Sequence, residues 1–247
     1  MATEGSGASR AGSDAFHNED VFLVEEGLGL YVVCDGVGRS PAGEVAARVA
    51  AEALEAFVER CDRAIDLWAE PAARSVVDRA MRYALTAVVE AGEAEPESRG
   101  SATTITMLLA HGDRGVLGHR GDSRAYLIRR DRAIQLTVDH ELTEAAANGS
   151  GSDELDVFSV RFRPGDTIIL CSDGAEDSVR DDAIVRVAGD LSPRVLASRI
   201  VSAANRRDSG VDATVVVVRV RGDLEPGWLE LSMPPVGTAF GHTLEYA

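Results

Sequence analysis

The chain has 247 residues, a hydrophobic content of 45% and a formal net charge of −16 at pH 7. This acidic balance argues against binding to bulk nucleic acid, which requires a basic surface. No apolar run is long enough to span a membrane, and residues 1–12 lack the apolar middle of a signal peptide, so we expect a cytoplasmic protein. Three cysteines without paired spacing argue against a disulfide framework or a zinc site.

The first part of the chain predicts two strands followed by two helices. Residues 1–12 are rich in Gly, Ser and Ala, and we expect them to form a flexible N-terminus. Apolar, β-branched runs at Val21–Val24 and Gly29–Cys34 flank a short loop and predict a hairpin. Apolar residues at helical spacing then predict helices over Ala42–Arg60 and Pro71–Ala91.

The middle of the chain predicts a cluster of strands. The cluster begins at Ala102–Ala110, and we expect it to continue as a meander. The further strands of this meander are Gly115–His119, Arg124–Ile128 and Ile134–Leu136. Two later runs, Val157–Phe162 and Thr167–Cys171, flank an Arg-Pro-Gly-Asp turn, so we expect them to pair with each other.

The remaining elements complete the fold prediction. Helices are expected over Glu141–Ala147, Asp181–Val187 and Ser192–Asn205, with a last strand at Thr214–Val220. Strands broken by helix pairs, without β-α-β alternation, predict an α+β fold, a four-layer α-β-β-α sandwich of two antiparallel sheets flanked by helices. We expect one domain over residues 13–221 and a C-terminal tail over residues 222–247. These last boundaries follow from the Gly and Pro residues of the tail.

Four short acidic segments lie at the edges of these apolar runs. They are Asn18-Glu19-Asp20, Asp35-Gly36, Ser172-Asp173-Gly174 and Asp212. If the strand ends converge, several carboxylates meet, and like charges that close cannot all ionise unless a cation is bound. Mg²⁺ and Mn²⁺ prefer oxygen ligands, so the pattern indicates a metal centre. Taken singly, each Asp-Gly pair is also a common turn signal.

These acidic segments and the sequences between them resemble, in order, the motifs of the bacterial PP2C-type, metal-dependent protein phosphatases. The segments that carry the resemblance are Asn18-Glu19-Asp20, Val33–Gly38, Ala42-Gly43-Glu44, Gly100–Thr104, Gly121–Tyr126, Gln135–His140, Leu170–Gly174 and Asp212-Ala213-Thr214. The resemblance implies a sandwich fold with a binuclear Mn²⁺ or Mg²⁺ centre. It also implies hydrolysis of phosphoserine and phosphothreonine by a metal-activated water. The implied partner is a phosphorylated protein, modified by an opposing serine/threonine kinase.

The resemblance further implies a role for each acidic position. Asp35 would bridge the two metals, and the Gly36 carbonyl would bind one of them. Asp173 and Asp212 would complete the shell of the other metal. The implied catalytic residues are Asp35, Asp173 and Asp20. The implied metal-binding residues are Glu19, Asp20, Asp35, Gly36, Asp122, Asp173 and Asp212, where Asp122 belongs to a third, weaker site that Asp177 could support. Arg124 is expected to pair with charges rather than to bind phosphate.

The chain departs from the family pattern in the parts that would hold a substrate. Ala15 stands where the family usually has a phosphate-binding arginine, for which Arg39 is a candidate substitute. The flap region around residues 141–157 is short. The last motif, usually Asp-Asn-x-Thr, lacks its asparagine and is one residue shorter at Asp212.

Three readings of these departures remain open. The first is an active protein phosphatase with an open cleft. The second is a regulatory or binding module that keeps the metal site and has little or no turnover. The third, which we favour least, is a metal-dependent hydrolase of a small phosphate ester.

Overall fold

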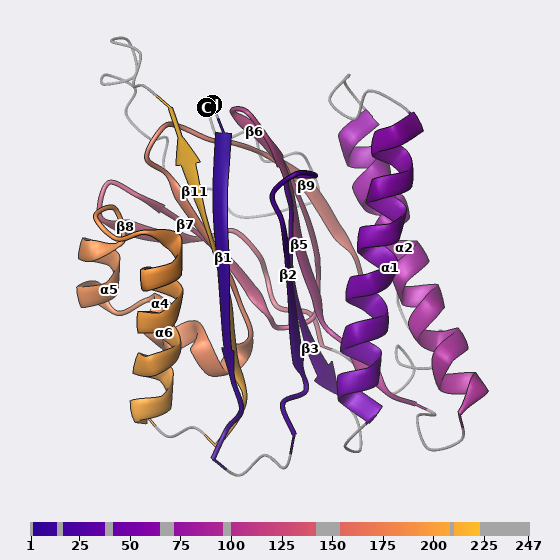
Figure 1. Cartoon of the computed structure of the whole chain (residues 1–247). Helices are drawn as coiled ribbons and strands as arrows, with labels where there is room; N and C mark the ends of the chain where they lie inside the picture. The colour runs from indigo at the N-terminus through magenta and orange to yellow at the C-terminus, as the bar shows by residue number, and fades with distance from the viewer. Residues whose placement is uncertain are drawn as a thin grey trace.

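The computed structural model describes residues 2–13, 17–37, 42–64, 72–95, 100–141, 154–207 and 210–222. In these residues two antiparallel sheets stack face to face, and helices cover both outer faces (Figure 1). The predicted four-layer sandwich is therefore confirmed. Within the same ranges, no helix combines the length and the apolar character needed to cross a membrane. Ala15, Arg39, most of the expected helix at 141–147 and the tail after residue 222 lie outside the described residues.

Sheet A has five strands, and one helical layer covers its outer face. Its strands, in spatial order, are β1 (Ala2–Arg10), β11 (Ala213–Arg221), β10 (Thr167–Cys171), β7 (Arg124–Arg129) and β8 (Arg132–Gln135). The short helices η2 (Asp173–Ala175) and α4 (Glu176–Val179) follow β10 directly, and α5 (Asp182–Val187) and α6 (Pro193–Arg207) complete the layer.

Sheet B is covered by the two long helices. Its strands, in order, are β2 (Asp20–Glu25), β3 (Leu30–Val37), β5 (Ile105–His111), β6 (Arg114–Arg120) and β9 (Asp156–Arg161), and β4 (Ala102–Thr103) pairs with the end of β3. Helices α1 (Ala42–Ala64) and α2 (Ala72–Ala94) pack side by side on its outer face (Figure 1).

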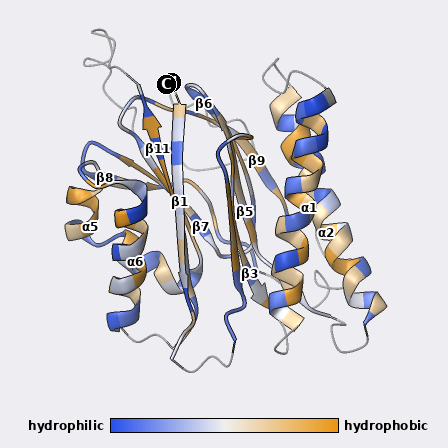
Figure 2. Cartoon of the chain, viewed as in Figure 1, coloured by the Kyte–Doolittle hydropathy of each residue, from blue (hydrophilic) through white to orange (hydrophobic). Residues whose placement is uncertain are grey.

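Apolar side chains fill the spaces between the layers. One cluster lies between sheet B and the helices α1 and α2, and another between sheet A and α6. A third, with the fully buried Tyr31 and Ile168, lies between the two sheets. In Figure 2 the central strands are accordingly apolar, whereas the outer faces of the helices carry hydrophilic residues. The resulting core fixes the strand ends on which the acidic residues lie.

Three sequence predictions about the strands are wrong. Residues 2–10 form the edge strand β1, which pairs with β11 along its whole length and is not a flexible terminus. Strands β9 and β10 do not pair with each other, because β9 adds to β6 in sheet B and β10 lies between β7 and β11 in sheet A. The expected meander breaks in the same way, since β6 and β7 belong to different sheets.

The glycines of β1 explain how a segment of low strand propensity forms a strand. A Cβ at Gly5 would lie 2.3 Å from the ring of Tyr31, which is fully buried, and a Cβ at Gly7 would lie 2.2 Å from the ring of Phe22. The missing side chains let β1 pack closely against β2 and β3 of the other sheet. Packing and pairing with the valine-rich β11 therefore decide the conformation, against the low strand propensity of glycine.

Candidate metal centre

The predicted acidic residues lie at one end of both sheets, the lower end in Figure 1. Asp20 opens β2 and lies directly opposite Asp35 near the end of β3. In sheet A, Asp173 follows the end of β10, and Asp212 precedes the start of the neighbouring β11. Antiparallel pairing therefore brings residues from the two ends of the chain to the same place.

Asp20 is held by a buried hydroxyl from the other sheet. The Ser172 hydroxyl donates to Asp20 Oδ2 at 2.8 Å, and the same Ser172 Oγ accepts the Thr214 backbone N–H at 3.0 Å. Asp20 Oδ1 is buried and has no hydrogen-bond partner among the residues that the structure describes. Burial raises the pKa of Asp20 from 3.8 to about 7, although hydrogen bonds from Thr214 and Ser172 lower it, and the charges of Asp212 and Asp173 raise it further. A buried carboxylate oxygen of this kind is suited to binding a cation.

Hydrogen bonds hold the backbone of Asp35, and its side chain lies near other carboxylates. Its N–H donates to Thr104 Oγ1 at 2.9 Å, and its carbonyl accepts from the Thr104 N–H at 2.8 Å and from the Thr103 hydroxyl at 2.9 Å. Burial, followed by the charges of Asp20 and Asp173, raises the pKa of Asp35 to about 9. A cation bound nearby would lower this pKa, because a positive charge favours the ionised carboxylate.

Gly36 and Gly43 let the start of α1 approach the acidic strand ends. A Cβ on Gly36 would lie 2.2 Å from the Gly43 carbonyl oxygen, and a Cβ on Gly43 would lie 2.5 Å from Glu19 Oε2. The Gly36 N–H donates to the Glu19 carbonyl at 3.1 Å. These close approaches bring the Glu19 side chain next to the Gly36 backbone, and only glycine fits at either position.

Asp173 and Asp122 lie on neighbouring strand ends of sheet A. Burial, followed by the charge of Asp122, raises the pKa of Asp173. Ser123 joins this region to sheet B, because its hydroxyl lies 2.7 Å from Thr104 Oγ1. Arg124 forms two hydrogen bonds with Asp139, at 2.9 and 2.7 Å, and an ion pair with Glu176. The expectation that Arg124 pairs with charges is confirmed.

Asp212 is held differently from the other carboxylates. Its Oδ1 accepts the Gly12 N–H at 2.8 Å, and its Oδ2 accepts the Glu19 N–H at 2.7 Å. Its negative charge nevertheless contributes to the raised pKa values of Asp20, Asp35 and Asp173. Asp212 is thus close to the acidic cluster while both of its oxygens have backbone partners.

The donor set suits a hard divalent cation. It consists of oxygen atoms, one of them buried and without a partner among the described residues, and burial together with neighbouring carboxylates raises the pKa values of Asp20 and Asp35. In the described ranges, however, no three His, Cys, Asp or Glu side chains already enclose a metal position. The residues therefore have the chemistry of a metal site. Among the described residues, however, their side chains do not surround one metal position.

Sequence reasoning missed the hydroxyls that position the carboxylates. Thr104, Ser172 and Thr214 are fully buried and hold Asp35 and Asp20 through the contacts given above. In the sequence, Ser172 and Thr214 stand beside Asp173 and Asp212, whereas Thr104 only ends the Gly100–Thr104 segment. Their hydrogen bonds could not be predicted, because every one joins segments far apart in the chain.

The fold and its acidic end identify the class of protein. The description "Protein phosphatase 2C" belongs to the family whose profile matches residues 6–206, and the chain is a member of this family. The serine/threonine protein phosphatase PstP of Mycobacterium tuberculosis is 30% identical over 226 residues, which cover 83% of this chain and 42% of PstP. The chain thus corresponds to less than half the length of that relative. The serine/threonine phosphatase stp of Listeria innocua is 29% identical, covering 82% of this chain and 90% of stp.

Solved structures agree with this assignment. The structure of M. tuberculosis PstP superposes with a TM-score of 0.77 at 26% identity, covering 90% of this chain and 100% of that one. The catalytic domain of PstP in complex with two manganese ions superposes with a TM-score of 0.75 at 28% identity, covering 89% and 99%. A relative of the same fold therefore binds two Mn²⁺ ions.

Proposed function

We propose that this chain is a metal-dependent phosphatase that hydrolyses phosphoserine and phosphothreonine in proteins. The observation that supports this most is the convergence of Asp20, Asp35 and Asp173 at one end of a PP2C fold, where burial and then the neighbouring negative charges raise all three pKa values. The phosphorylated protein would be the product of a serine/threonine kinase.

We assign each acidic residue a role in binding the metal ions or their water molecules. Asp35 and the Gly36 carbonyl would bind Mn²⁺ or Mg²⁺ together with Asp173, while Glu19 and Asp20 would hold water molecules around the cations. Asp122 would serve a third, weaker position. When bound, the cations would lower the pKa of a water molecule and offset the charge of the phosphoryl group. Thr104 and Ser172 would hold Asp35 and Asp20 in place.

A second function rests on a specific departure. By the order of the motifs, Ala15 takes the position where the family usually has a phosphate-binding arginine. Loss of that arginine would favour a regulatory or binding module with little turnover. The phosphatase remains our conclusion, because a crowded set of carboxylates is costly unless a cation neutralises it.

The deciding experiment is hydrolysis of a phosphothreonine peptide and of an aryl phosphate with and without Mn²⁺. We expect Mn²⁺-dependent release of phosphate, which Asp35→Asn and Asp173→Asn should each reduce by at least about a hundredfold, since each removes a charged oxygen ligand. Asp190→Asn is the matched control, because Asp190 is exposed on the turn between α5 and α6. A wild-type protein that binds Mn²⁺ without hydrolysing either substrate would establish the second function instead.

A further inference from the structure

The Asp212 carboxylate fastens both ends of one connection. Its two oxygens accept the backbone N–H groups of Gly12 and Glu19, and these two residues bracket the connection between β1 and β2. A charged acceptor makes such bonds stronger than those between neutral groups. The carboxylate therefore ties the end of sheet A to the first acidic segment of sheet B.

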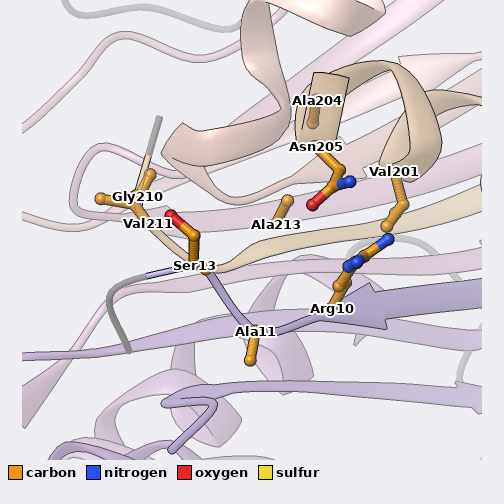
Figure 3. A pocket seen from close by; sticks show the side chains of 10 residues that line it. Arg10, Ala11, Ser13, Val201, Ala204, Asn205, Gly210, Val211 and Ala213 are labelled. Atoms are coloured by element: carbon orange, nitrogen blue, oxygen red, sulfur yellow. The ribbon is translucent and has the colours of Figure 1, made fainter. Parts of the chain in front are cut away.

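Val211, one residue earlier, lies against the turn that carries Asp173. Its Cγ2 atom lies 3.0 Å from the place that a Cβ on Gly174 would occupy. Figure 3 shows Val211 and Gly210 beside Ser13, and a Cβ on Gly12 would lie 2.6 Å from the Val211 carbonyl carbon. The small cavity there has a volume of about 10 Å³, so the two segments are closely packed. Val211 therefore packs against the turn at Gly174, the residue after Asp173.

Thr214 fixes the register of this segment. It is fully buried, its N–H donates to Ser172 Oγ at 3.0 Å, and its hydroxyl lies 2.6 Å from Ser9 Oγ. In the motif Asp-Asn-x-Thr the aspartate lies three residues before the threonine. Counted back from Thr214, that position is Val211, and Asp212 takes the position of the asparagine.

We propose that Asp212 is a positioning residue that fastens the β1–β2 connection, and that Val211 occupies the place of a metal-binding carboxylate. The metal part of this inference rests on the proposed function. One of the two cations then has a poorer set of ligands on this chain and binds more weakly.

The first arm of the test uses hydrogen exchange on the metal-free protein. Asp212→Asn keeps one acceptor oxygen and replaces the other by a donor, so one of the two N–H groups loses its partner. We expect a peptide covering residues 10–20 to exchange at least about tenfold faster, since a hydrogen bond to a charged group is lost. Unchanged exchange there would overturn the positioning role.

The second arm measures Mn²⁺ affinity and stoichiometry by calorimetry. Val211→Asp should tighten the weaker Mn²⁺ site by at least about tenfold, since it supplies a missing charged ligand. Val195→Asp is the control, because Val195 on α6 is 43% exposed and Val211 is 45% exposed, so both variants add one surface carboxylate. Equal affinities in these two variants would overturn the assignment of Val211.

Two further variants separate this inference from the proposed function. Asp173→Asn should weaken Mn²⁺ binding by at least about tenfold, whereas Asp212→Asn removes a nearby charge but no ligand and should weaken it clearly less. If Asp212→Asn weakens it as much as Asp173→Asn does, Asp212 is a ligand and the inference fails. If Asp173→Asn has no effect, the metal centre of the proposed function fails, and the exchange experiment still decides the role of Asp212.

Discussion

Single buried polar side chains connect segments that lie far apart in the chain. Ser172 both donates to Asp20 and accepts from Thr214, so one side chain connects β2, β10 and β11. His119 has a comparable place in sheet B, where Nδ1 lies 3.0 Å from the Thr106 hydroxyl and Nε2 lies 3.0 Å from the Val138 carbonyl. Both residues are fully buried, so neither can exchange its protein partner for water.

Replacing Ser172 by alanine should destabilise the fold measurably. The change leaves Asp20 Oδ2 without this donor and the Thr214 N–H without an acceptor, and unsatisfied buried groups cost about 1–3 kcal/mol. Urea unfolding would measure the loss. Ser198→Ala, at an exposed position of α6, should change the unfolding free energy by less than about 0.5 kcal/mol. Equal effects of the two substitutions would contradict the proposed role of Ser172.

His119 should make the protein less stable in acid. Burial, followed by the charge of His140, lowers the pKa of His119 from 6.5 to about 4, although Asp156 and Asp139 act in the opposite direction. Between these values the unfolded chain binds a proton that the folded chain does not, so stability falls as the pH falls through this window. The slope contributed by one such group is at most about 1.4 kcal/mol per pH unit.

Unfolding in urea at pH 7, 6, 5 and 4.5 measures this slope, with His119→Gln as the comparison. Glutamine retains an amide group that can donate to the Val138 carbonyl and does not titrate. The variant should therefore show a shallower loss of stability below pH 6.5. Parallel pH profiles for the two proteins would show that other groups cause the acid sensitivity.

Strand β1 shows how an element can depend on the absence of side chains. Gly5→Ala places a methyl group against the Tyr31 ring, which is fully buried and cannot move aside. Overpacking of this kind costs about 1–3 kcal/mol, and thermal unfolding would measure it. Gly27→Ala is the control, because nothing lies within 4 Å of a Cβ at Gly27. If both variants unfold at the wild-type temperature, close packing of β1 is not what stabilises it.

The sequence predicted those elements whose own pattern is strong. The helices α1 and α2, the strands β2, β3, β10 and β11 and the four-layer class all follow from apolar periodicity or β-branched runs. Strand β1 was missed because Ala, Gly and Ser carry no strand signal, and its conformation comes from the partner strand β11. The separation of β9 from β10 could not be predicted either, since the Arg-Pro-Gly-Asp turn also permits the chain to change sheets.

In the candidate site, too, the sequence predicted the residues with a local signal and missed those that depend on distant partners. The carboxylates were found because their motifs are local, and the structure places Asp20 opposite Asp35 and brings the charges of Asp122, Asp173 and Asp212 near them. Their partners were not found, because Ser172 and Asp20 are 152 residues apart and Asp212 and Gly12 are 200 apart. Hydrogen bonds over such separations depend on the completed fold.

At the scale of the whole molecule, β1 shields a long apolar edge. It pairs with every residue of β11 from Ala213 to Arg221, and β11 is dominated by valine. Removing residues 2–10 would expose this edge, which is a template for pairing with another chain. We expect the shortened protein to aggregate in sedimentation or light-scattering experiments.

A second deletion controls for the loss of chain length. Removing residues 223–247 leaves every strand of sheets A and B in the chain, so the remaining protein should keep its sheets. If the protein that lacks residues 2–10 stays monomeric and unfolds as cooperatively as the wild type, β1 does not protect β11.

The pairing of β1 with β11 also sets an order of events during biosynthesis. Asp20 and Asp35 leave the ribosome early, whereas Asp173 and Asp212 follow much later, and β1 has no partner until β11 has been made. Such distant pairing forms slowly, because the loop between the strands must close first. A nascent chain therefore carries only part of the acidic cluster, and the proposed metal centre can assemble only after translation has produced the last strand.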